Sequence, residues 1–198
     1  MAAALKPALV LIGFMGAGKS RAAREAAAAL GVPADDADAL LEAKLGAPIA
    51  TVFARDGEAA FRAAEEELAG ALLETADGGV IALGGGALGS ERVRAALARH
   101  VVVALDVDLD TAWARAHASG RPLARERGAF EALYKARGPV YDAAADAVLP
   151  ATGTGVVGEA MVAFVLAGAY REKFGGDHVD DVLEAVARYE ERIGWRRR

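Results

Sequence analysis

The chain has 198 residues, of which 54% are hydrophobic and 26% charged, and its net charge at pH 7 is −5. This balance is typical of a folded domain. The lack of cysteine excludes a disulfide framework, a thiolate zinc site and a cysteine nucleophile. The acidic charge argues against a nucleic-acid partner, and no apolar run approaches the ~20 residues that span a membrane. With no signal-peptide pattern at the N-terminus, we expect a cytoplasmic protein.

Short apolar runs alternate with longer alanine-rich segments over the first 150 residues. The apolar runs lack polar alternation and predict strands buried on both faces, at 8–12, 80–83, 101–105 and 147–149. Amphipathic segments between them predict helices at 19–30, 38–45, 58–74, 90–99 and 109–119. Strand–helix alternation of this kind predicts an α/β fold with a parallel sheet between helices.

Two further segments stand outside this alternation. Residues 120–128 (GRPLARERG) contain two glycines, a proline and three arginines. Such a loop is typical both of a mobile cover over an anionic ligand and of a solvated surface loop, and the pattern favours neither. After Pro150, the sequence predicts a hydrophobic helix at about 156–174 and a charged helix at about 179–193.

A phosphate-binding motif follows the first predicted strand directly. Residues 13–20 read GFMGAGKS, which fits the P-loop pattern G-x-x-x-x-G-K-[ST] between a strand and a helix. In this motif the backbone N–H groups and the helix dipole bind phosphate oxygens, the lysine reaches the β- and γ-phosphates, and the serine ligates Mg²⁺. We therefore expect an ATP or GTP site formed by Gly13, Gly16, Ala17, Gly18, Lys19 and Ser20.

A P-loop alone does not separate a small-molecule kinase from other nucleotide-binding proteins. GTPases read guanine with an Asn/Thr-Lys-x-Asp motif, and this chain contains no asparagine. Motor and transporter ATPases need a strand that ends in a carboxylate, and Asp106 after the strand at 101–105 leaves that class open. A small-molecule kinase needs a second set of residues for the phosphoryl acceptor.

Several residues qualify for that second set, each with a plain structural alternative. Asp36 and Asp38 would lie on one side of an extended segment, where one holds Mg²⁺ through water and the other faces an acceptor hydroxyl; alternatively they cap a helix. Arg62 lies on a predicted helix, where salt bridges to residues three or four positions away would account for it, and Arg137 suits a carboxylate clamp or a charge at a helix C-terminus. The glycines at 84–86 permit close approach of a ligand at the end of a strand.

Taken together, these motifs resemble the shikimate kinase family. The resemblance rests on six ordered pieces: GFMGAGKS at 13–20, DAD at 36–38, FRAAE at 61–65, GGG at 84–86, RPL at 121–123 and RGPVY at 137–141. It covers about residues 5–150, and the segment after about residue 152 lies beyond it.

The resemblance implies transfer of the ATP γ-phosphate to the 3-hydroxyl of shikimate, with Mg²⁺ as cofactor and the two small molecules as partners. It implies that Lys19, Asp38 and Arg121 are catalytic, that Ser20 and Asp36 hold the metal, and that Arg115 and Arg121 bind ATP beside the P-loop. The implied shikimate ligands are Asp38, Arg62, Gly84, Gly85, Gly86 and Arg137.

The implied fold is a five-stranded parallel sheet of the nucleoside-monophosphate-kinase type. We expect a monomer with a kinase domain over residues 1–175, a short lid at about 120–128 and a helical extension at 176–198. Two other functions stay open at this point. A different kinase of the same superfamily, such as a gluconate kinase, would share the P-loop but lack the other motifs. A related module could bind nucleotide or a partner without turnover.

Overall fold

The computed structural model describes residues 5–151, and the predictions for the two helices after Pro150 and for a boundary at 175 lie outside that range. The strands are β1 Leu9–Gly13, β2 Ala34–Asp36, β3 Val80–Ala82, β4 Val101–Asp106 and β5 Ala147–Pro150. The helices are α1 Lys19–Leu30, α2 Ala37–Leu45, α3 Ile49–Thr75, the 3-10 turn η1 Ala87–Gly89, α4 Glu91–Leu97, α5 Leu109–Ala118 and α6 Arg127–Ala144.

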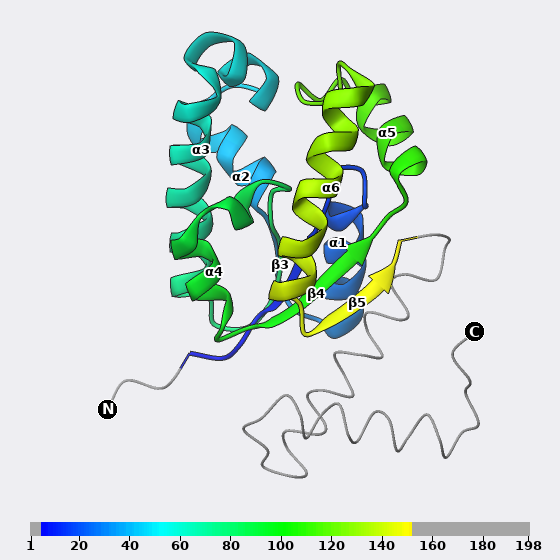
Figure 1. The fold of residues 1–198 in the computed structure, drawn as a ribbon. Helices are drawn as coiled ribbons and strands as arrows, with labels where there is room; N and C mark the ends of the chain where they lie inside the picture. The colour runs from blue at the N-terminus through cyan, green and yellow to red at the C-terminus, as the bar shows by residue number, and fades with distance from the viewer. Residues whose placement is uncertain (1–4, 152–198) are drawn as a thin grey trace, which may run out of the picture. The chain divides into compact units, whose positions relative to one another are not determined.

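The five strands form one parallel sheet in the order β2-β3-β1-β4-β5. Every residue of the central strand β1 is buried, as the run without polar alternation predicted. Helix α1 packs against β1 and β3, and α6 packs against β1 and β4 on the opposite face (Figure 1). The predicted α/β fold with a five-stranded parallel sheet is confirmed.

Helix α3 is longer than the sequence predicted. The pattern predicted a helix at 58–74, whereas α3 runs over Ile49–Thr75 with a break at Gly57, whose φ of 84° is left-handed. The turns before the break are helical because Ile49 and Val52 are buried against Leu41 and Phe61. Tertiary burial thus supports two turns that local pattern alone did not indicate.

Helix α6 was missed by the sequence prediction, because Gly128 and the pair Gly138-Pro139 interrupt its pattern. Glu126 caps the helix by accepting hydrogen bonds from the N–H groups of Gly128 and Ala129. An interior proline has no N–H to donate and normally costs a helix about 3 kcal/mol or more. Here the helix continues through Pro139, since Phe130 and Tyr141 on its inner face are buried.

The parallel strands bring distant motifs to one edge of the sheet. The P-loop follows β1, Asp36 ends β2, and the glycines at 84–86 follow β3. Ligands of open parallel sheets bind at this carboxyl edge. Among residues 5–151, no helix is long and apolar enough to cross a membrane.

Candidate active site

The P-loop is held in a shape that only glycine allows. The φ angles of Gly13, Gly16 and Gly18 are 137°, 84° and 89°. A Cβ at Gly13 would lie 2.5 Å from the carbonyl oxygen of Leu105, and one at Gly16 would lie 2.8 Å from that of Ala112. Helix α1 begins directly after Gly18, and no side chain among residues 5–151 caps its first turn. Its free N–H groups and dipole are therefore available to an anion.

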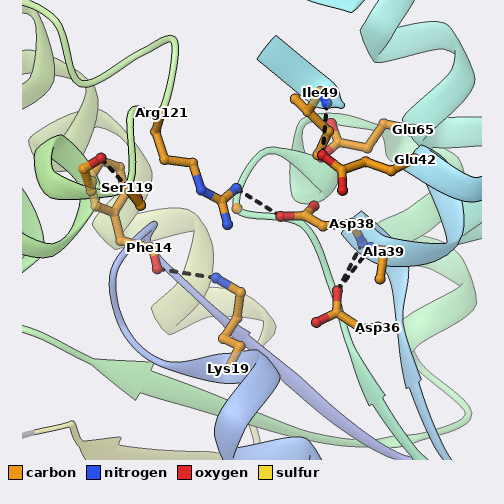
Figure 2. Close-up of polar contacts among 12 residues, drawn as sticks. Phe14, Lys19, Asp36, Asp38, Ala39, Glu42, Ile49, Glu65, Ser119 and Arg121 are labelled. Atoms are coloured by element: carbon orange, nitrogen blue, oxygen red, sulfur yellow. Dashed lines mark hydrogen bonds and ion pairs between the residues drawn. The ribbon is translucent and has the colours of Figure 1, made fainter. Parts of the chain in front are cut away.

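Lys19 folds back over this loop. Its Nζ donates to the carbonyl oxygens of Gly13 at 2.8 Å and Phe14 at 3.1 Å (Figure 2). Burial of the amine, only partly offset by the nearby carboxylates of Asp38 and Asp36, lowers its pKa to about 8. A cation with so little solvation is stabilised by an anion placed beside it, as a phosphate would be.

The two aspartates are not arranged as an extended pair, so that part of the prediction was wrong. Asp36 ends β2, and Asp38 already lies in the first turn of α2. Asp36 caps the helix, since its Oδ1 accepts from the N–H groups of Asp38 at 3.0 Å and Ala39 at 3.3 Å (Figure 2). The capping alternative is therefore correct for Asp36. Both aspartates nevertheless line the hollow beside the P-loop.

An arginine from the loop between α5 and α6 reaches across to Asp38. The Nη1 of Arg121 lies 2.8 Å from Asp38 Oδ2 (Figure 2). Arg115 in α5 donates from Nη1 to the Gly16 carbonyl at 3.1 Å.

The loop between α5 and α6 covers residues 119–126. The last two residues of the predicted lid segment, 120–128, lie in the first turn of α6. Arg127 pairs with Asp110 and lies over the Trp113 ring, so it joins the start of α6 to α5.

A second group of charged residues lies on α3, next to the glycine loop. Arg62 Nη1 contacts Glu65 Oε2 at 2.5 Å, and Glu65 is only 5% exposed. Burial raises the pKa of the Glu65 carboxyl, against the opposing effect of the Arg62 guanidinium. The guanidinium also lies so close to Gly86 that a Cβ there would collide with it. The absence of a side chain at Gly86 therefore makes room for Arg62.

Helix α6 supplies two further polar residues that contact the glycine loop. Arg137 donates from Nη1 to the Gly85 carbonyl at 2.7 Å, and its guanidinium lies 5.9 Å from the centre of the Phe14 ring. Tyr141, one turn further along, donates its hydroxyl to the same carbonyl at 2.5 Å. The loop after β3 is thus tied to α6 through one backbone oxygen.

These residues line two adjoining hollows. The one we call the phosphate pocket is lined by Met15, Gly16, Gly18, Lys19, Ser20, Asp36, Asp38, Leu83, Gly85, Arg115, Ser119 and Arg121. The one we call the acceptor pocket is lined by Met15, Asp38, Ile49, Phe53, Phe61, Arg62, Glu65, Gly85, Gly86, Arg121, Pro122, Leu123 and Arg137. Asp38 and Arg121 line both, which places a carboxylate and a guanidinium at the junction.

Most of the site residues expected from the sequence line one of these pockets, and three do not. Gly13, Ala17 and Gly84 are buried beneath the surface. A Cβ at Gly84 would lie 2.9 Å from Asp38 Oδ1 and closer still to Glu65 Oε1, so the absence of a side chain at this glycine makes room for both carboxylates. Two polar residues were not expected in the site: Glu65, which the FRAAE motif contains, and Tyr141, which ends RGPVY. Both lie at positions quoted in those motifs.

The geometry agrees with what comparison with known proteins finds. The model of the shikimate kinase family matches residues 15–165. The chain belongs to the shikimate kinase family. A shikimate kinase of Mycobacterium avium is 44% identical over 145 residues, which are 71% of this chain and 82% of the relative. One of Ruegeria pomeroyi is 40% identical over 188 residues, covering 92% of this chain and 91% of its own length.

Solved structures of the family share the fold. The shikimate kinase of Acinetobacter baumannii, determined in complex with shikimate, superposes with a TM-score of 0.75 at 29% identity, covering 85% of this chain and 96% of that one. The enzyme of Aquifex aeolicus gives a TM-score of 0.67 at 27% identity, with coverages of 85% and 99%. The similarity to the Ruegeria relative also extends past Thr152, so part of the C-terminal segment has a counterpart in another shikimate kinase.

Proposed function

We propose that this chain transfers the γ-phosphoryl group of ATP to the 3-hydroxyl of shikimate. The observation that carries the proposal is the junction of the two pockets, where Asp38 and Arg121 line both. A phosphoryl donor in one pocket and a hydroxyl acceptor in the other would meet there. Membership of the shikimate kinase family supports shikimate as the acceptor.

ATP would occupy the phosphate pocket. The N–H groups at the start of α1 would bind phosphate oxygens, and the Lys19 amine would exchange its two carbonyl acceptors for the β- and γ-phosphates. Arg115 would stand near the adenine, held by its hydrogen bond to Gly16. Phosphoryl transfer leaves the protein mainly the tasks of positioning and charge neutralisation, which these cations perform.

The residues present also fit a magnesium ion. Asp36 uses Oδ1 for capping, and Oδ2 accepts no hydrogen bond from residues 5–151, while the Ser20 hydroxyl lines the same pocket. Mg²⁺ keeps several waters and takes one or two protein oxygens plus phosphate, so no larger acidic cluster is needed. Ser20 directly and Asp36 through water would hold the ion, which neutralises phosphate charge when bound.

Shikimate would occupy the acceptor pocket. Arg62 and Arg137 approach from α3 and α6, and a guanidinium matches a carboxylate because its fork binds both oxygens. The backbone of Gly85 and Gly86 lines the floor between them. This places two positive charges at one end of the pocket and the Asp38 carboxylate at the junction.

Asp38 would act on the acceptor hydroxyl. As the hydroxyl oxygen bonds to the γ-phosphorus and the bond to the ADP oxygen breaks, the hydroxyl proton passes to the Asp38 carboxylate. Asp38 is paired with Arg121, so the guanidinium would have to leave the carboxylate in order to contact the phosphate. The same residue pair would then link closure of the 119–126 loop to the reaction.

Replacement of Asp38 tests this assignment. Asp38→Asn should lower kcat for shikimate-dependent ADP release by about 10²–10⁴-fold, the usual contribution of a general base. ATP binding should be retained, because the P-loop does not depend on the carboxylate charge. The matched control is Asp35→Asn, an exposed neighbour whose loss should leave kcat unchanged. Near-normal turnover by Asp38→Asn would remove Asp38 from the reaction.

The monomeric state, the cytoplasmic location and the domain boundary expected from the sequence stay predictions.

A further inference from the structure

Tyr141 makes a contact that the proposed roles do not use. Its hydroxyl donates to the Gly85 carbonyl at 2.5 Å, and Arg137 donates to the same oxygen at 2.7 Å. A carbonyl oxygen has two lone pairs, so these two donors saturate it. Both come from α6 at positions i and i+4, which lie on one face of a helix.

The tyrosine is a permanent donor. It is 7% exposed, and burial raises its pKa to about 12, so the hydroxyl keeps its proton over the whole range in which the protein is assayed. The Arg137 guanidinium donates to the Gly85 oxygen and also interacts with the Tyr141 hydroxyl, an interaction that partly opposes the rise in the tyrosine pKa.

The shared carbonyl also sets the orientation of a peptide group. In a trans peptide the C=O and the following N–H point in opposite directions. Anchoring the Gly85 oxygen on α6 therefore turns the Gly86 N–H away from α6, and that N–H makes no backbone hydrogen bond within the described residues. The anchor therefore fixes the plane of the Gly85–Gly86 peptide at the acceptor pocket, and it fixes the Arg137 guanidinium beside the Gly85 oxygen.

We propose that Tyr141 is a positioning residue for the substrate carboxylate, an inference that rests on the proposed function. It acts through the Gly85 carbonyl, holding Arg137 in the orientation that receives the carboxylate, and it does not itself touch the reacting atoms. Its loss should weaken binding of the acceptor and spare both ATP binding and the chemical step.

The first test is Tyr141→Phe, which removes only the hydroxyl. We expect the KM for shikimate to rise about fivefold, the effect of one lost hydrogen bond, with kcat and the KM for ATP unchanged. Tyr134→Phe is the matched control: Tyr134 lies on the same helix and donates to the Val107 carbonyl at 2.8 Å, away from the glycine loop. Its shikimate KM should stay at the value of the unmodified chain.

The second test asks whether the rise in the KM for shikimate arises from the contact with the substrate carboxylate. The carboxamide of shikimate keeps the three hydroxyls and lacks the negative charge, so the unmodified chain should prefer the acid in kcat/KM. Tyr141→Phe should shrink that preference about fivefold, whereas a general loosening of the pocket would lower both values in the same proportion. Thermal unfolding of both tyrosine variants confirms that the assay temperature lies in the folded range.

The outcomes separate the two proposals. If the unmodified chain releases ADP with shikimate but Tyr141→Phe keeps the shikimate KM and the acid preference, Tyr141 has no positioning role and the proposed function stands. A variant that fails to fold at every assay temperature would show a structural role and overturn the inference. If the unmodified chain shows no shikimate-dependent ADP release, the proposed function falls and the inference with it.

Discussion

The phosphate pocket and the acceptor pocket are built in different ways, although they share Met15, Asp38, Gly85 and Arg121. The largest contribution to the phosphate pocket comes from one segment, 13–20, which supplies five of its twelve lining residues and whose shape follows from its glycines and from the start of α1. The acceptor pocket is assembled from α3, the loop after β3 and α6, joined by side-chain contacts to backbone oxygens and to each other.

Because the two pockets are built differently, substitutions in each pocket should change different kinetic constants. Changes in the phosphate pocket should act on ATP binding and on kcat, because the P-loop binds the donor and neutralises its charge. Changes in the acceptor pocket should act on the KM for shikimate and leave the KM for ATP alone. The following substitutions test that division, in order of expected size.

Lys19→Met should give the largest effect. The amine lies over the P-loop, where it would meet the transferred phosphate, so its loss should lower kcat by about 10²–10³-fold and raise the KM for ATP. Arg21→Met is the control, since Arg21 is exposed and paired with Glu25. Steady-state ADP release measures both. A Lys19→Met protein with normal kcat would show that the pocket binds something other than a phosphoryl donor.

Arg137→Ala should reduce kcat/KM for shikimate by about 10- to 100-fold through loss of a charge-assisted hydrogen bond. The KM for ATP should not change, because Arg137 does not line the phosphate pocket. Steady-state kinetics with each substrate varied in turn make the comparison. An equal loss for both substrates would mean that the two pockets are not separable.

Gly86→Ala should raise the KM for shikimate about five- to tenfold, because the added Cβ displaces the Arg62 guanidinium from its place beside the loop. Gly89→Ala is the matched control on the following 3-10 turn, where a Cβ would meet no atom within 4 Å. The same kinetics distinguish them. If both variants kept the normal KM, the position of Arg62 would have no part in acceptor binding.

His100 should affect stability and neither substrate. Its Nδ1 accepts from the Ala8 N–H at 3.1 Å, and its Nε2 contacts the Leu73 carbonyl at 2.9 Å, a pattern that suits the neutral ring. Burial lowers the pKa of His100, so the unfolded chain binds the proton more readily, and stability falls as the pH drops below about 6.5.

Replacing the ring with a side chain that does not titrate should flatten this dependence. The Tm of the unmodified chain should fall by a few degrees more between pH 7 and pH 5 than that of His100→Gln, as calorimetry would show. Equal slopes would assign the acid sensitivity to other groups. At pH 7.5 both substrate KM values should be normal in the variant.

The same contrast explains what the sequence could predict. The P-loop and the buried strands carry their structure in local pattern, so β1, the P-loop and α1 follow from residues 8–30 alone. Helix α6 and the first turns of α3 were missed because distant contacts stabilise them against unfavourable local signals, namely Pro139 and Gly57.

The sequence predicted several of the residues that form the acceptor pocket but not the contacts between them. Family motifs placed Arg62, Arg137 and the glycine loop in one site, yet nothing local indicates that one carbonyl, that of Gly85, receives both Arg137 and Tyr141. The capping geometry of Asp36 likewise depends on where β2 ends and α2 begins, which the sequence left open between a strand and a helix start.

The most direct test of the central claim is ADP release from Mg-ATP with and without shikimate, with gluconate and quinate as control acceptors. We expect turnover that depends on shikimate and is far slower with either control. ATP binding without turnover on any acceptor, or faster turnover with gluconate, would contradict the assignment of the acceptor pocket to shikimate.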